Sequence, residues 1–133
     1  YELDDHGTEV FSVLAAQSSS FSGITPNAQY HLYLTEDDDT EYRIEEFNWT
    51  FAAERADSAG VDVINSSLGY NEFDDESMNY ALSDLTGEKA VVSIAAGKAI
   101  AKGMVVVASA GNEGNFASWR KITPPSDVDG LIA

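Results

Sequence analysis

The sequence contains no cysteine, which excludes disulfide bonds, thiolate catalysis and cysteine-based zinc sites. It is also poor in basic residues, because 7 Lys and Arg stand against 23 Asp and Glu and give a net charge of −16. This excess of negative charge argues against nucleic acid and anionic membrane surfaces as partners. No apolar run reaches the roughly 18 residues that a membrane span needs, so we expect no membrane segment in this chain.

Sequence motifs for nucleotides and metals are absent as well. Neither G-x-G-x-x-G nor G-x-x-x-x-G-K-[ST] occurs, which removes the usual support for a phosphate-binding loop. The two histidines, His6 and His31, are far apart and make a poor zinc site. The acidic runs at 36–46 and 72–76 carry oxygen ligands that calcium prefers, but they lack the alternating ligands and Gly of a calcium loop. We therefore expect no cofactor and interpret these runs as a solvated acidic face, with calcium in a parent protein as the open alternative.

The 133 residues, 44% of them hydrophobic, are enough for one globular domain with its own core. Because the chain starts at Tyr1 rather than Met, we expect a processed or excised piece of a longer protein. Periodicity and turn residues predict, in chain order, a helix over 5–16, a strand over 30–34, a helix over 42–59, a strand over 61–65, a helix over 90–101, a strand over 104–108 and a partial strand over 130–133. This alternation indicates an α/β fold with a mostly parallel sheet.

Residues 105–114 read Val-Val-Val-Ala-Ser-Ala-Gly-Asn-Glu-Gly. The Val and Ala run predicts a strand buried on both faces. The small residues after it let a substrate approach the backbone closely, and Asn112 can aim its amide at charge that develops in a transition state. An ordinary strand that ends in a Gly/Asn turn is the alternative. Because ligands of parallel sheets bind at the carboxyl ends of strands, we expect 67–69 and 109–112 to be neighbours at one rim.

His6 is the candidate proton acceptor. Asp5 can cap the first predicted helix and place His6 in its first turn. The positive end of the helix dipole there disfavours the imidazolium form and keeps His6 neutral. A surface histidine beside a helix cap is the alternative. His31 lies in a predicted strand, where a packing or edge role is favoured over catalysis.

Four segments in this order resemble the subtilisin-like serine peptidases, the subtilase family. They are His-Gly-Thr-Glu-Val at 6–10, Gly-Ile-Thr-Pro-Asn-Ala at 23–28, Asp-Val-Ile-Asn-Ser-Ser-Leu-Gly at 62–69 and Val-Val-Ala-Ser-Ala-Gly-Asn-Glu-Gly at 106–114. The resemblance extends from Asp4 to Ala133. It implies a three-layer, subtilisin-like α/β fold and hydrolysis of peptide bonds by a Ser-His-Asp acyl-transfer mechanism. By the same resemblance we expect a secreted or cell-envelope protein of a bacterium.

The resemblance also implies roles for individual residues. His6 matches the general base, and Asn112 matches the asparagine that stabilises the oxyanion. Ser67, Leu68 and Gly69 match the segment that pairs with the substrate backbone. Ser109, Ala110 and Gly111 match the opposite wall of the primary specificity pocket, where small residues leave room for a large side chain.

The chain departs from the family pattern at two catalytic positions. Asp4 and Asp5 are too close to His6 to orient it as the triad aspartate does, and no Asp-(Ser/Thr)-Gly segment precedes it. The nucleophile motif Gly-Thr-Ser-Met-Ala is absent, and neither Ser118 nor Ser126 has small neighbours and a following helix. We therefore expect residues 1–133 to be the central portion of a subtilase catalytic domain, truncated at both ends and inactive alone.

Two other functions stay open at this stage. One is a pseudoenzyme or acidic peptide-binding module that retains the cleft without catalysis. The other is an unrelated parallel α/β protein that binds a small molecule at the same rim. For a subtilase fragment, the expected partners are a peptide or protein substrate and further copies of the chain, which would associate through exposed sheet edges.

Overall fold

The computed structural model describes residues 5–117, 119 and 121–133. The chain divides into two compact units, Tyr1–Tyr33 and Leu34–Ala133, and each unit is described by itself.

The first unit is built on helix α1 (His6–Ala15), which begins where the sequence predicts. The predicted side-chain cap is wrong, because Asp5 has helical backbone angles and its side chain accepts no capping hydrogen bond. The Asp5 carbonyl instead accepts from the Glu9 N–H at 2.9 Å. After α1 the chain folds back, and the Gly23 N–H donates to the Ala16 carbonyl at 2.7 Å. A Cβ at Gly23 would overlap the Leu14 carbonyl, so this close return requires glycine.

The strand predicted over 30–34 is not formed. These residues have no pairing partner in the described part of the chain, and Leu32 and Leu34 are 69% and 80% exposed. Aromatic and aliphatic residues favour a strand only where a neighbouring strand satisfies the backbone and packs the side chains. The boundary between the two units falls inside this segment.

The second unit follows the predicted order of helix, strand, helix and strand. Its regular elements are α2 (Ile44–Ala59), β1 (Val63–Ser66), α3 (Val91–Ala101) and β2 (Val105–Ala108), with short 3₁₀ helices η1 (Glu76–Met78) and η2 (Leu82–Asp84) between β1 and α3. The predicted glycine cap of α2 is confirmed, since Gly60 has φ +77° and its N–H donates to the Asp57 carbonyl.

β1 and β2 pair in parallel, with Val63 opposite Val105 and Ser66 opposite Ala108. On the other side of β2, the strand predicted over 130–133 is reduced to a single parallel bridge between Val107 and Ile132. The α/β class and the parallel sheet are therefore confirmed.

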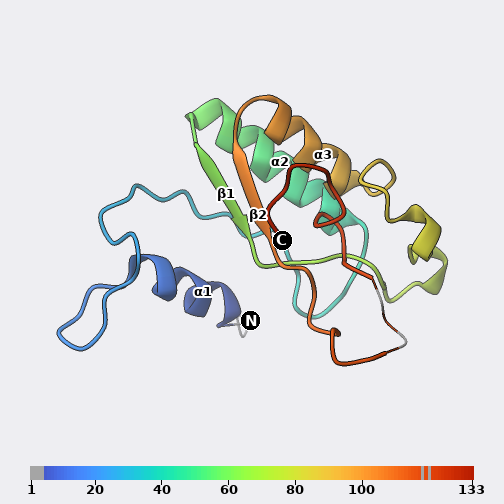
Figure 1. The fold of residues 1–133 in the computed structure, drawn as a ribbon, viewed down its shortest axis with the longest axis horizontal. Coiled ribbons are helices and arrows are strands. Elements are labelled where there is room, and N and C mark those ends of the chain that lie inside the picture. The colour runs from blue at the N-terminus through green and yellow to red at the C-terminus, as the bar shows by residue number, and fades with distance from the viewer. Residues whose placement is uncertain (1–4, 118, 120) are drawn as a thin grey trace. The chain divides into compact units, whose positions relative to one another are not determined.

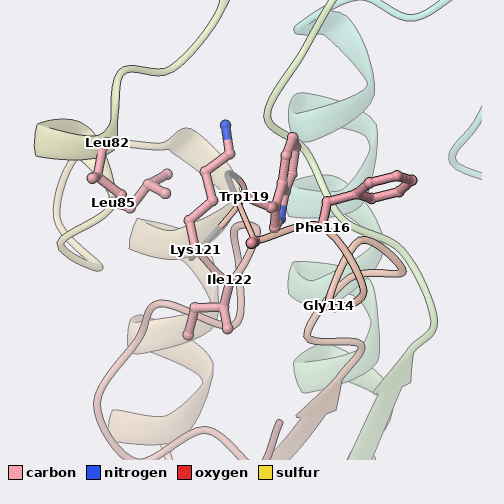
Figure 2. A pocket seen from close by; sticks show the side chains of 8 residues that line it. Leu82, Leu85, Gly114, Phe116, Trp119, Lys121 and Ile122 are labelled. Carbon is pink, nitrogen blue, oxygen red and sulfur yellow. The ribbon is translucent and has the colours of Figure 1, made fainter.

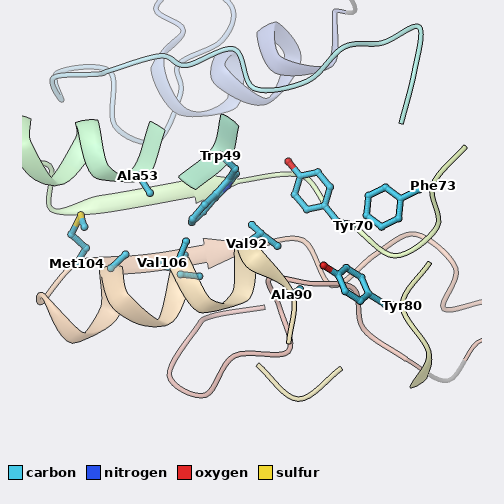
Figure 3. Packing of buried hydrophobic residues seen from close by; sticks show 12 residues of the cluster. Trp49, Ala53, Tyr70, Phe73, Tyr80, Ala90, Val92, Met104 and Val106 are labelled. Atoms are coloured by element: carbon cyan, nitrogen blue, oxygen red, sulfur yellow. The ribbon is translucent and has the colours of Figure 1, made fainter. Parts of the chain in front are cut away.

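Helices α2 and α3 pack together against one face of this sheet (Figure 1). Side chains from both helices, from β2 and from the residue before it form the core, including Trp49, Ala53, Val92, Met104 and Val106 (Figure 3). The prediction that residues 105–108 are buried on both faces is wrong. Val63 and Val105 are 55% and 46% exposed, because the helices of this unit cover only the opposite face.

The prediction of a solvated acidic face is also wrong for Glu45 and Glu46, which are 1% and 0% exposed. The Glu46 carboxylate on α2 accepts from the Tyr80 hydroxyl at 2.7 Å and from the Val92 N–H, in the first turn of α3, at 3.1 Å. The Arg43 guanidinium lies 4.2 Å from the Tyr80 ring centroid and donates to the Met78 carbonyl. Buried carboxylates persist when donors satisfy them, and the donors of Glu46 lie far away in sequence. One Glu45 oxygen accepts from the Asp37 N–H, and the other has no partner in the described residues.

The exposed edge and face of this sheet lead to a prediction about association. In the described residues β1 pairs only with β2, which leaves its outer edge open beside the exposed Val63 and Val105. We expect the 133-residue chain to form a dimer or larger assembly in small-angle scattering at high concentration. Val63→Lys should weaken this assembly, whereas Ser58→Lys, on the exposed end of α2, should not. A monomer at every concentration would contradict the expectation.

Candidate functional site

The two segments that follow β1 and β2 begin side by side at one end of the sheet. The Ser109 N–H donates to the Ser66 carbonyl at 3.1 Å, which continues the strand pairing one residue beyond β2. The Ser66 hydroxyl in turn accepts from the Trp49 indole N–H at 2.9 Å, which fixes the end of β1 to α2. The prediction that 67–69 and 109–112 are neighbours at one rim is therefore confirmed.

A third segment, 123–126, is hydrogen-bonded to both of the segments that follow β1 and β2. The Tyr70 N–H donates to the Pro124 carbonyl at 2.9 Å, and the Ser126 hydroxyl donates to the Ser109 carbonyl at 2.6 Å. Pro124 and Pro125 are fully buried. Sequence reasoning missed this element, because the Thr-Pro-Pro-Ser segment indicates only a turn before the last predicted strand.

Asn112 lies on the exposed side of this rim. Its backbone N–H donates to the Glu113 carboxylate at 3.0 Å, and Gly111 before it has φ +104°. Because Asn112 is exposed, its side-chain amide can be reached by an external acceptor, while its backbone N–H is held by Glu113. The role of Glu113 was not foreseen from the sequence.

The other residues considered for catalysis lie in different parts of the structure. His6 is the first residue of α1, exposed and in the first unit. Ser126 is buried, and its hydroxyl donates to the Ser109 carbonyl. Asp4 and Ser118 lie outside the described residues.

An open hollow lies between the loop after β2 and the segment around η2. Figure 2 shows Leu82 and Leu85 on one side and Trp119 and Phe116 on the other. The Lys121 ammonium lies 3.9 Å from the Trp119 ring centroid and 3.9 Å from the Glu72 carboxylate. Most residues that line this hollow are apolar. The cation among them, Lys121, already contacts Trp119 and Glu72.

The acidic segment 36–46 holds a carboxyl group with a raised pKa, that of Glu41. Burial raises the pKa of Glu41 to about 7, and the nearby carboxylates of Glu45, Glu36 and Asp74 add to the rise. Burial also raises the pKa of Tyr70, whose hydroxyl donates to Glu36 at 2.6 Å.

Across the described ranges, no three His, Asp or Glu side chains are arranged to hold a metal ion. No helix in the same ranges is long and apolar enough to cross a membrane.

The family comparison and the search for similar proteins agree with each other. The model of the subtilase family matches residues 1–133. Subtilisin amylosacchariticus of Bacillus subtilis subsp. amylosacchariticus and subtilisin J of Geobacillus stearothermophilus are each 32% identical over 131 residues. These alignments cover 96% of this chain and 30% of each relative. Subtilisin DY of Bacillus licheniformis is 33% identical over 139 residues, covering 96% of this chain and 41% of the relative. The chain thus spans about a third of the length of the curated relatives it matches.

The position of Glu41 predicts a pH dependence of stability. Its pKa is about 7 in the folded chain and 4.5 in an ordinary setting. Folding therefore favours the protonated carboxyl, and this contribution is complete below about 4.5 and is lost as pH rises through about 7. In denaturant titrations, wild type should lose stability relative to Glu41→Gln across this window, and the difference should level off outside it. Glu54→Gln, on the exposed side of α2, is the control. Parallel curves for wild type and Glu41→Gln would contradict the assignment.

Proposed function

The chain belongs to the subtilase family, and from this premise we propose that it is the central part of a serine endopeptidase that cleaves peptide bonds by acyl transfer. The observation that carries the proposal is the shared rim at the carboxyl ends of β1 and β2. The hydrogen bond from Ser109 to Ser66 sets two backbone segments side by side there, with the Asn112 amide beside them and open to an acceptor. The family resemblance assigns both segments to the substrate cleft.

In the proposed reaction, the peptide lies extended along Ser67, Leu68 and Gly69 and pairs with their backbone. Ser109, Ala110 and Gly111 form the facing wall. A serine from outside the chain attacks the scissile carbonyl, His6 accepts the serine proton, and His6 then returns it to the leaving amine. The carbonyl oxygen gains negative charge during attack, and the Asn112 amide donates to it. Acyl transfer of this kind requires no cofactor.

The nucleophile and the triad aspartate come, in this proposal, from other parts of a parent protein. The chain carries no Gly-Thr-Ser-Met-Ala motif, and the Ser126 hydroxyl is buried against the Ser109 carbonyl. We place the parent protein in the secreted or cell-envelope fraction of a bacterium, by family resemblance. Fractionation of the source cells with an antibody to this chain would test the location, and a purely cytoplasmic signal would oppose it.

Two substitutions in the parent protein test the assigned roles. Asn112→Ala should lower kcat by about 10²–10³-fold with little change in KM, because the amide acts on charge present mainly in the transition state; this magnitude was measured on a subtilisin. His6→Ala should lower kcat by on the order of 10⁶-fold, also the scale seen in a subtilisin. Asn115→Ala and His31→Ala are matched controls and should keep wild-type rates. Equal rates for Asn112→Ala and wild type would remove Asn112 from the mechanism.

Labelling with a fluorophosphonate, which reacts with an activated serine, distinguishes an active peptidase from a pseudoenzyme. The 133-residue chain alone should hydrolyse no peptide and incorporate no fluorophosphonate, because it has no activated serine. The parent protein should incorporate one equivalent at a serine outside this chain, and His6→Ala should suppress the labelling. Labelling of Ser126 or Ser118 would contradict the proposed inactivity of the chain. An unlabelled, inactive parent would favour the pseudoenzyme.

A further inference from the structure

Backbone hydrogen bonds show which edge of β1 and of the segment after it stays open. The Ser66 carbonyl accepts from the segment that follows β2, and the Tyr70 N–H donates to the Pro124 carbonyl at 2.9 Å. The even-numbered residues of this stretch therefore direct their backbone groups toward β2 and the segment 123–126. Because successive residues of an extended chain alternate between the two edges, Ser67 and Gly69 face the outer edge. A peptide that adds to this edge as a strand pairs with these two residues.

The next position on the outer edge is already occupied by the chain itself. Asn71 follows Gly69 in the alternation, and its carbonyl accepts from the Tyr80 N–H at 3.0 Å. Paired strands lie about 4.8 Å apart, so the backbone at Tyr80 stands where an added strand would continue beyond Gly69. The outer edge therefore ends after Gly69, and the part of the chain that ends it is residues 71–80, here called the closing loop.

Several contacts hold the closing loop in this place. Within it, the Asn79 side-chain oxygen accepts from the Phe73 N–H at 2.7 Å. The Asp74 N–H donates to the Glu41 carbonyl at 3.0 Å, and the Asp74 carboxylate accepts from the Glu41 N–H at 3.2 Å. The Phe73 and Tyr80 side chains are 6% and 4% exposed, and their ring centroids lie 5.9 Å apart (Figure 3). Moving the loop away from the edge would break these hydrogen bonds and expose both rings to water.

We propose that the closing loop limits the substrate cleft to three residues on the amino side of the scissile bond, those that lie along Ser67, Leu68 and Gly69. The inference rests on the proposed function, in which the acyl part of the peptide pairs with this segment. The facing wall 109–111 begins beside Ser66, so the scissile carbonyl lies toward Ser67 and the peptide runs from there toward the loop.

The closing loop has a direct consequence for substrate choice. A fourth residue of the peptide has to leave the outer edge at the loop, because the Asn71 carbonyl already has the Tyr80 N–H as its donor. It therefore gains no backbone hydrogen bond of the kind that the first three residues make. The peptidase selects its substrates by three residues on the amino side, and a longer chain on that side does not improve cleavage.

The test is a series of acetylated peptides with one to six residues before the same scissile bond and the same leaving group, cleaved by the parent protein. The value of kcat/KM should rise by about two- to tenfold with each residue up to the third, which is the scale of one backbone hydrogen bond. From the third residue to the sixth it should stay constant within about twofold, below the effect of such a bond. A larger gain from the fourth, fifth or sixth residue would overturn the inference.

Two double variants test whether the closing loop sets this limit. Asp74→Ala/Asn79→Ala removes both side-chain acceptors that anchor the loop, so the fourth residue should now raise kcat/KM by more than about twofold. Asp75→Ala/Ser77→Ala is the matched control, because it also removes one carboxylate and one polar side chain, from the exposed part of the same loop. The control should keep the length dependence of the wild type.

Each failure has a distinct meaning. If wild-type cleavage continues to improve beyond the third residue, the inference is wrong and the proposed function stands. If Asp74→Ala/Asn79→Ala keeps the wild-type length dependence while its thermal unfolding stays cooperative, the closing loop does not end the cleft. If this variant does not fold, the wild-type series still decides. If the parent cleaves no peptide and fluorophosphonate labels no serine, the proposed function fails and this inference fails with it.

Discussion

The parallel pairing of β1 with β2 is the interaction on which the site depends. Because both strands run the same way and stay in register to Ser66 and Ala108, the chain leaves both at the same end of the sheet. The hydrogen bond from the Ser109 N–H to the Ser66 carbonyl then holds the two exits together. The segments that we propose for substrate binding are these two exits, and parallel sheets collect their functional loops at the carboxyl ends of strands. The buried segment 123–126 fixes the separation of the exits.

Behind the sheet, the Glu46 carboxylate joins the two helices that support it. Its carboxylate accepts hydrogen bonds from the Val92 N–H at the positive end of α3 and from the Tyr80 hydroxyl in the segment before α3. Each buried donor left without an acceptor costs about 1–3 kcal/mol, so the contacts are worth keeping even in a chain with a net charge of −16. Two acidic side chains in the first turn of α2, Glu45 and Glu46, are thus part of the interior. Burial, with the nearby carboxylates of Glu45, Glu36 and Asp74, also raises the pKa of Glu41.

The local sequence pattern was sufficient to predict the helices, the two paired strands and the shared rim. The run of valines before Ser109 predicts β2, the glycine at 60 predicts the end of α2, and the alternation of helix and strand predicts the parallel pairing. Local pattern was not sufficient where a distant partner decides. Residues 30–34 have strand composition, but no strand lies beside them among the residues that the structure describes. Glu46 looks solvated in the sequence until Tyr80 and Val92 are placed against it. Thr123 lies more than 50 residues from Gly69 in sequence, so no pattern around either could show that they meet.

The most direct test of the account is a crystal structure of the parent protein with a peptide boronate bound to its nucleophilic serine. The account predicts a boronate oxygen at about 3 Å from the Asn112 side-chain amide, where an oxyanion would accept its hydrogen bond. It also predicts that the inhibitor backbone pairs with the segment from Ser67 to Gly69. An inhibitor bound away from the rim, or an Asn112 amide directed away from the boronate, would contradict it.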